Sequence, residues 1–289
     1  MTPSAHGGGA GDPSGSRLPP VVGPGDLAGV EPPPVLVDVR WYLDGRSGAD
    51  AHAAGHLPGA VFLDLDRWLA APAGGGGRHP LPDPGTFTEG LAAAGIGDDD
   101  HVVAYDDAGG AVAARLVWLL RVTGRSAALL DGGLRSWTGP LQSGSVERAR
   151  TAPQVRPWPP AAVADAAAAA GSGTVLLDAR ASERYRGDVE PVDPRAGHVP
   201  GARNLPATDL LDDDGRLLPV ERLAAAFTGV GAGADADVVA SCGSGVTACL
   251  LLVAREHAGL PPGRLWPGSF SEWSRDPANQ VVTGPSPSA

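Results

Sequence analysis

The sequence predicts an α/β fold that occurs twice, as two consecutive domains, each with a mainly parallel central sheet flanked by helices. Three observations lead to this prediction. Four short motifs recur in the same order, and the offset between paired motifs stays between 136 and 142 residues. Each copy alternates short β-branched and apolar runs with Ala/Leu-rich helical stretches, as α/β units do. The chain has 289 residues, 43% of them hydrophobic, which is enough for two packed cores.

The repeated motifs define the two copies. They are VLVDVR at 35–40 with VLLDAR at 175–180, GHLPGA at 55–60 with GHVPGA at 197–202, VVAY at 102–105 with VVAS at 238–241, and Gly132/Trp137 with Gly268/Trp273. A repeat of this length indicates tandem domains, because the repeating units of solenoids are much shorter.

Composition places the domain boundaries. Residues 1–19 are rich in Gly, Pro and Ser without the apolar segment of a signal peptide, and we expect a disordered leader. The first domain is predicted at 20–140 and the second at 161–282. The Pro-, Arg-, Ser- and Gly-rich stretch 141–160 is the predicted linker, and 283–289 the tail.

The elements of each copy follow from these apolar runs and helical stretches. In the first copy the predicted strands are 35–39, 60–62, 101–105 and 127–130, and the predicted helices 66–71, 86–95 and 111–122. In the second copy the predicted strands are 174–178, 203–205, 237–241 and 264–266, and the predicted helices 207–211, 219–228 and 246–257. Residues 74–77, all glycine, are interpreted as a flexible loop, because a phosphate-binding loop needs a strand before it and a helix after it.

Cys242 stands between a predicted strand and a predicted helix, in the loop sequence CGSGVT. Backbone N–H groups and the helix dipole at such a position favour negative charge, and the thiolate is the nucleophilic form of cysteine. Gly243 and Gly245 let the backbone approach a ligand closely. We therefore predict a reactive thiol rather than a buried structural cysteine. At an offset of 136 the first copy carries Asp106, so one active site per chain is expected.

Charge and composition exclude several functions. The net charge is −11, and all 22 basic residues are arginine. Without lysine, the chain cannot form a Schiff base, bind pyridoxal phosphate covalently or use a Walker-type lysine. An acidic chain is expected to bind nucleic acid and anionic membranes poorly. The sequence has no run of about 18 apolar residues, so no membrane-spanning helix is predicted. Two cysteines are too few for a disulfide framework. Because a catalytic thiol must stay reduced, we expect the protein in the reducing cytoplasm.

The ordered motifs resemble those of two-domain rhodanese-type sulfurtransferases, especially the 3-mercaptopyruvate sulfurtransferase branch. The resemblance spans residues 20–282 and rests on Trp41-Tyr42, both Gly-His-x-Pro-Gly-Ala motifs, Arg184-Tyr185, the CGSGVT loop and the motif 268–273. It implies that only the second rhodanese-like domain is catalytic and that the site lies in the cleft between the domains. It also implies a double displacement, in which the Cys242 thiolate takes sulfur from an anionic donor as a persulfide and passes it on. No metal or organic cofactor is implied.

The resemblance assigns roles to further residues. Arg184 matches the arginine that binds the anionic donor, and either Arg195 or Arg186 could be a second one. The N–H groups and hydroxyls of the loop are expected to bind the donor and the charged sulfur; its residues are Gly243, Ser244, Gly245, Val246 and Thr247. Trp41 and Tyr42 either face the cleft or pack in the core. His56 and His198, repeated in both copies, are expected to be structural, and Cys249 is a core residue or a resolving thiol.

The expected donor is 3-mercaptopyruvate, because neutral Gly243 and Ser244 stand where thiosulfate-specific relatives carry basic residues. The expected acceptor is a small thiol, a thioredoxin-like protein or cyanide. Two alternatives remain: a thiosulfate:cyanide sulfurtransferase, and a persulfide carrier without turnover. A cysteine phosphatase is disfavoured, because Ala248 occupies the position of its phosphate-binding arginine.

Overall fold

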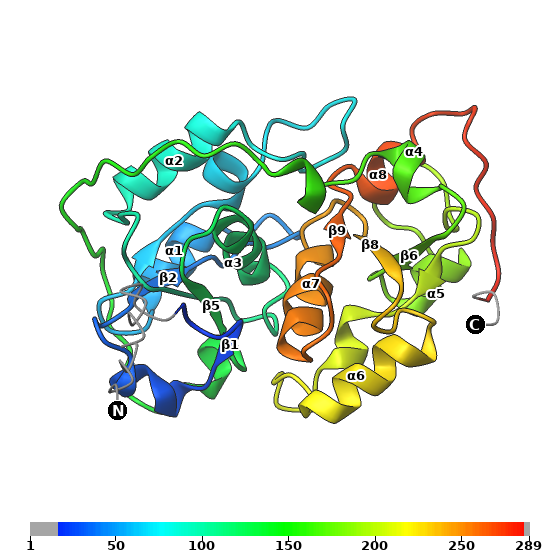
Figure 1. Cartoon of the computed structure of the whole chain (residues 1–289). Helices are drawn as coiled ribbons and strands as arrows, with labels where there is room; N and C mark the ends of the chain where they lie inside the picture. Colours follow the sequence, from blue (N-terminus) through cyan, green and yellow to red (C-terminus); the bar gives the residue numbers. More distant parts are fainter. Residues whose placement is uncertain (1–16, 286–289) are drawn as a thin grey trace, which may run out of the picture.

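The computed structural model describes residues 17–285 and contains two α/β domains side by side (Figure 1). Each domain is built on one parallel sheet flanked by helices, so the predicted fold class is confirmed. Most of the predicted leader and the end of the predicted tail lie outside the described residues. Within residues 17–285, no helix has the length and apolar character needed to cross a membrane.

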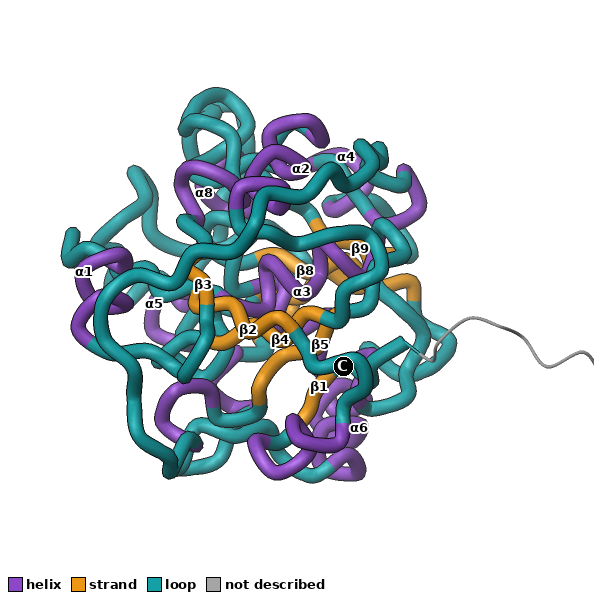
Figure 2. The backbone as a smooth tube through the Cα atoms, turned by 90° about the vertical axis from the view of Figure 1, so that its left-hand side faces the viewer, coloured by secondary structure: helices purple, strands orange, loops and turns teal. Residues whose placement is uncertain are grey.

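The sheet of the first domain has five parallel strands in the order β1-β5-β4-β2-β3 (Figure 2). They are β1 (Val21–Val22), β2 (Val35–Asp38), β3 (Val61–Phe62), β4 (Val102–Tyr105) and β5 (Ala127–Leu130). Parallel neighbours need crossover connections, which here contain the helices α1 (Gly48–Ala54), α2 (Pro84–Ala93) and α3 (Ala113–Val122) and the short helical turn Leu65–Leu69. A second short turn, Gly133–Ser136, follows β5. A further turn, Pro24–Gly29, follows β1.

The sheet of the second domain has four parallel strands in the order β7-β6-β8-β9. They are β6 (Thr174–Asp178), β7 (Arg203–Asn204), β8 (Asp237–Ser241) and β9 (Arg264–Leu265). The helices are α4 (Ala166–Ala169), α5 (Ser182–Arg186), α6 (Val220–Gly229), α7 (Ala248–His257) and α8 (Ser269–Trp273), with short turns at Pro160–Ala162 and Ala207–Leu210. All eight predicted strands are present, whereas β1, α1, α4, α5 and α8 were not predicted.

The helices α3 and α7, one from each domain, pack against each other at the domain boundary (Figure 1). Nearly every side chain of both helices is buried, as expected for helices that are apolar on all faces. One apolar core continues from the first domain through α3 and α7 into the second. This continuous core fixes the two domains relative to each other and therefore fixes the shape of any site between them.

The predicted linker is extended and runs over the first domain, with its last part along the top of the view in Figure 1. Trp158 anchors it to the first domain, because its ring packs 5.3 Å from that of Phe87 and its Nε1–H donates to the Pro82 carbonyl at 2.8 Å.

The repeated motifs make matching contacts in both domains. Asp38 at the end of β2 pairs with Arg40, as Asp178 at the end of β6 pairs with Arg180, and all four are buried. The ring of His56 stacks on His52 at 3.9 Å, and that of His198 stacks on Tyr185 at 3.7 Å. These contacts lie at the strand ends of each domain, whether or not the domain carries a thiol.

Asp106 of the first domain occupies the loop that follows β4, as Cys242 does after β8. Its buried carboxylate accepts four backbone N–H groups at 2.8 Å, from Ala108, Gly110, Val112 and Ala113. The first domain thus neutralises its loop N–H groups with a side chain of its own.

We expect Asp106→Asn to destabilise the protein by about 3 kcal/mol, because the amide NH₂ would face backbone N–H donors that lose their acceptor. Urea unfolding measures this loss. The exposed neighbour Asp107, which accepts from the Tyr42 hydroxyl, supplies the control variant Asp107→Asn. Equal midpoints for the two variants would show that the carboxylate of Asp106 is not needed.

Candidate active site

A cavity of about 310 Å³ lies between the two domains, and Cys242 is part of its wall. The first domain contributes Trp41, Arg78, His79 and Val112, and the second contributes Arg184 and the loop that starts at Cys242. Cys242 is 4% exposed, so its sulfur is accessible only through this cavity. A pocket of this size suits a small donor, and it leaves little of the Cys242 side chain in contact with water.

The loop from Cys242 to Thr247 connects β8 to α7 and turns tightly over its own cysteine. Gly245 N–H donates to Cys242 Sγ at 3.1 Å. Gly245 has φ +78°, and a Cβ there would lie 2.3 Å from the Pro267 carbonyl oxygen, so only glycine fits. Of the other predicted loop residues, Gly243, Ser244, Val246 and Thr247 line the cavity.

The segment that contains α8 supports this loop from behind. Cys242 N–H donates to Ser269 Oγ at 3.1 Å, and Phe270 N–H donates to the Cys242 carbonyl at 3.1 Å. Ser269 has φ +50°, whereas the first domain has Gly133 with φ +53° at the corresponding position. A serine in this left-handed conformation is strained, and its hydroxyl contact with the cysteine backbone explains why a side chain is present here.

Arg184 lies on α5 and lines the cavity, as expected of a donor-binding residue. Its guanidinium donates to Glu190 Oε1 at 2.6 Å and to Asp193 Oδ2 at 3.2 Å. Burial alone would raise the pKa of Glu190, but hydrogen bonds from Arg184 and from backbone N–H groups hold it below its ordinary value. Burial raises the pKa of Asp193, helped by Glu190 and opposed by the arginines around it.

The structure brings neither Arg195 nor Arg186 to this cavity. The guanidinium of Arg195 donates to the carbonyls of Trp273, Ser274, Asp276 and Asn279, and so anchors the C-terminal segment. Arg186 pairs with Asp188 at the surface. The interpretation of Arg195 as a donor-binding residue is therefore corrected, because its donors are used by backbone carbonyls outside the cavity wall.

Arg78 is the arginine that the first domain contributes to the cavity, beside Arg180 and Arg184 of the second, and sequence reasoning missed it. Arg78 follows the glycines 74–77, whose predicted flexible loop is instead packed against the second domain. A Cβ on Gly77 would lie 2.7 Å from the Gly268 carbonyl oxygen, and Arg78 N–H donates to Ser271 Oγ at 3.0 Å. No local pattern indicates this contact, because it joins residues 193 positions apart.

His79 connects the two domains beside the thiol. Its Nδ1 lies 2.8 Å from Ser244 Oγ, and its Nε2 lies 3.3 Å from Asp66 Oδ1. Since a carboxylate only accepts, the partners place the proton on Nε2, and Ser244 donates its hydroxyl hydrogen to Nδ1. Burial lowers the pKa of His79; Asp66 opposes this, while Arg115 and Arg78 reinforce it. Burial therefore favours the neutral ring, whose unprotonated Nδ1 accepts the hydrogen bond of the Ser244 hydroxyl.

Trp41 and Tyr42 separate in the structure. Trp41 lines the cavity, where its ring meets that of His79 edge to face at 5.3 Å and its Nε1–H donates to Asp66 at 2.8 Å. Tyr42 points elsewhere and donates to Asp107. Trp41 therefore holds both His79 and Asp66 in place, a role that the sequence motif alone does not specify.

Beneath the loop, Cys249 and Arg115 form a fully buried layer. Burial raises the pKa of Cys249 to about 12, and its thiol contacts the Gly245 carbonyl at 3.4 Å. Arg115, on α3 of the first domain, donates to the carbonyls of Gly245 and His79, both at 3.2 Å. Cys249 thus stays a protonated core thiol, and Arg115 ties both halves of the site together.

Among the residues that the structure describes, no three His, Cys, Asp or Glu side chains gather as a metal-binding group. The site instead combines one accessible thiol, a chain of polar groups from Ser244 to Asp66, and three arginines in the cavity wall, Arg78, Arg180 and Arg184. This set can hold a small anion and form a bond at the sulfur of Cys242.

Comparisons with known proteins agree with this geometry. The chain matches the rhodanese-like domain family twice, over residues 28–140 and 162–276. It is 46% identical over 266 residues to the "Probable 3-mercaptopyruvate sulfurtransferase" of Pseudomonas aeruginosa, covering 88% of this chain and 94% of that protein. It is 41% identical over 263 residues to a Mycobacterium tuberculosis protein provisionally named thiosulfate sulfurtransferase, covering 87% and 92%.

Solved structures give the same result. The 3-mercaptopyruvate sulfurtransferase of Leishmania major superposes with a TM-score of 0.78 at 31% identity, covering 90% of this chain and 76% of that chain. The corresponding Escherichia coli protein superposes with a TM-score of 0.75 at 32% identity, covering 88% and 100%. The chain therefore belongs to the two-domain rhodanese-like sulfurtransferases.

Proposed function

We propose that this protein transfers sulfur from 3-mercaptopyruvate to a thiol or cyanide acceptor through a persulfide on Cys242. One observation carries the proposal: Cys242 shares a cavity with an arginine for the donor and with Ser244 and His79, and His79 is paired with Asp66. Persulfide formation splits the transfer into two displacements on one nucleophile.

In the first step the Cys242 thiolate attacks the sulfur of the donor, and the carbon–sulfur bond of 3-mercaptopyruvate breaks. The electron pair of that bond stays on carbon, which leaves the enolate of pyruvate and a Cys242 persulfide. Arg184 binds the donor carboxylate, for which a planar guanidinium is suited. Ser244, whose hydroxyl is oriented by its hydrogen bond to His79 Nδ1, gives its proton to the enolate carbon, and a proton from solvent restores the hydroxyl.

We expect Ser244→Ala to lower kcat with 3-mercaptopyruvate by about a hundredfold, which is the lower end of the rate loss caused by removing a general acid. Its effect with thiosulfate should be small, because the leaving sulfite needs no proton on carbon. Single-turnover rates with both donors measure this difference. An equal loss with both donors would mean that Ser244 shapes the loop but delivers no proton.

In the second step an acceptor thiolate or cyanide attacks the outer sulfur of the persulfide and releases the Cys242 thiolate. The loop N–H groups face the same sulfur in both steps, and Gly245 N–H already donates to it. A small thiol or a thioredoxin-like protein is the proposed acceptor. Both cysteines are free thiols, so we propose a reducing compartment, the cytoplasm, as the working location.

Thiosulfate is the second candidate donor, favoured by the similarity to the Mycobacterium tuberculosis protein and by the additional arginine, Arg78. Steady-state kinetics with both donors, using cyanide and a dithiol as acceptors, decide between them. A larger kcat/KM with 3-mercaptopyruvate supports the proposal. A larger kcat/KM with thiosulfate would make thiosulfate the donor in place of 3-mercaptopyruvate. Uptake of one sulfur per chain without turnover would instead identify a persulfide carrier.

A further inference from the structure

We propose that Arg78 and Asp193 select the charge of the donor: Arg78 is the second donor-binding arginine, and Asp193 occupies the donor's place while the site is empty. This inference rests on the proposed function and adds a specificity determinant from the domain that has no thiol. It assigns a role to an ion pair that spans the domain boundary.

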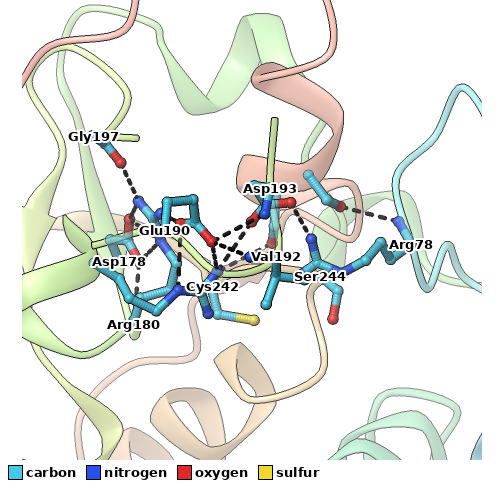
Figure 3. A network of polar contacts seen from close by, with 12 residues as sticks. Arg78, Asp178, Arg180, Glu190, Val192, Asp193, Gly197, Cys242 and Ser244 are labelled. Carbon is cyan, nitrogen blue, oxygen red and sulfur yellow. Dashed lines mark hydrogen bonds and ion pairs between the residues drawn. The ribbon is translucent and has the colours of Figure 1, made fainter. Parts of the chain in front are cut away.

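The first argument is the position of Arg78. A Cβ built on Gly243 would lie 2.6 Å from Arg78 Nη2 and 3.7 Å from Arg184 Nη1. Both guanidinium groups therefore lie beside the residue that follows the nucleophile, and both residues line the cavity. Figure 3 shows the side chain of Arg78 reaching from the first domain toward Asp193 near Cys242. An anion bound at the thiol would be within reach of both arginines.

The second argument is the pairing of Asp193. Its carboxylate pairs with Arg78 across the boundary and with Arg184 at 3.2 Å, within its own domain. The side chain of Asp193 is 2% exposed, whereas that of Arg78 is 21% exposed. Asp193 thus lies behind the cavity wall, and the exposed part of Arg78 faces the cavity, where a donor carboxylate can take over its hydrogen bonds.

The third argument is the charge balance of this corner. Three arginines, Arg78, Arg180 and Arg184, pair with three carboxylates, Asp178, Glu190 and Asp193. Figure 3 labels all of these residues except Arg184. The empty corner is therefore neutral when all six groups are ionised. A monoanion that displaces Asp193 from Arg78 adds one negative charge, whereas a dianion such as thiosulfate adds two beside buried carboxylates. Asp193 therefore discriminates against the dianion by charge repulsion.

Two variants test the proposal, with kcat/KM measured for 3-mercaptopyruvate and thiosulfate. We expect Asp193→Asn to raise the ratio of thiosulfate to 3-mercaptopyruvate kcat/KM by at least about tenfold, because it removes the repelling charge. We expect Arg78→Gln to lower kcat/KM with both donors by about tenfold, mainly through KM, and Arg78→Lys to recover part of this loss. The rate at which preformed persulfide passes to a thiol should change little.

The matched control is Arg275→Gln. Arg275 is exposed and donates to the Gly74 carbonyl, so it joins the same loop to the second domain without lining the cavity. If Arg78→Gln and Arg78→Lys both behave like this control, or if Asp193→Asn leaves the donor ratio unchanged, the inference is overturned. A wild-type protein that forms no persulfide with either donor would refute the proposed function itself, independently of these variants.

Discussion

Cys242→Ser abolishes sulfur transfer, with an expected fall in kcat of at least about a thousandfold, as for loss of other covalent nucleophiles. A serine hydroxyl cannot form the sulfur–sulfur bond on which both displacements depend. The fold should persist, because the substitution replaces one sulfur by oxygen in a residue that borders a cavity. Release of pyruvate or sulfite with each donor measures activity, and thermal unfolding confirms that the variant is folded.

The control for this variant is Cys249→Ser. Cys249 lies on α7 and is fully buried. Its thiol contacts the Gly245 carbonyl, and a serine hydroxyl would keep this contact. We expect Cys249→Ser to keep most of the activity. Substantial turnover by Cys242→Ser, or an equal loss in Cys249→Ser, would contradict the assignment of Cys242 as the nucleophile.

Arg184→Gln lowers kcat/KM with both donors by at least about tenfold, the effect of losing a charged hydrogen bond. Arg184 lines the cavity from the second domain, whereas Arg180, which also lines it, is paired with the buried Asp178; removal of Arg184 also leaves Glu190 and Asp193 with one fewer positive partner. Initial rates over a range of donor concentrations separate KM from kcat, and the loss should appear largely in KM.

Arg186→Gln is the matched control for Arg184. Both residues lie on α5, but Arg186 pairs with Asp188 at the surface and does not line the cavity. We expect kcat/KM of this variant to equal that of the wild type. A donor profile unchanged by Arg184→Gln would remove Arg184 from the site, and a loss confined to Arg186→Gln would restore the alternative arginine.

The features that could be predicted are local or repeated. Short apolar runs separated by glycine and proline located strands such as β2, β4, β5 and β8, because these runs are largely buried in a parallel sheet. The duplicated motifs identified two domains, and the glycines around Cys242 marked a loop that approaches a ligand. Each of these follows from residues that lie close together in the sequence.

The remaining features depend on contacts between distant residues. Arg78 and His79 follow a glycine run with no periodic pattern, and only packing of this loop on α8 places them at the thiol. Arg195 stands at a sequence position where a donor-binding arginine is expected. In the structure its guanidinium donates instead to backbone carbonyls of residues 273–279. The helix α5 has five residues and β1 has two, which are too short for a hydrophobic period to be recognised.

The most direct test of the account is the intact mass of the protein after brief exposure to 3-mercaptopyruvate without acceptor, followed by peptide mapping. We expect the mass of one sulfur atom to be added to each chain, located on the peptide that contains Cys242 and lost when a thiol is supplied. An unchanged mass under conditions of measurable turnover, or added sulfur located on Cys249, would contradict the persulfide mechanism.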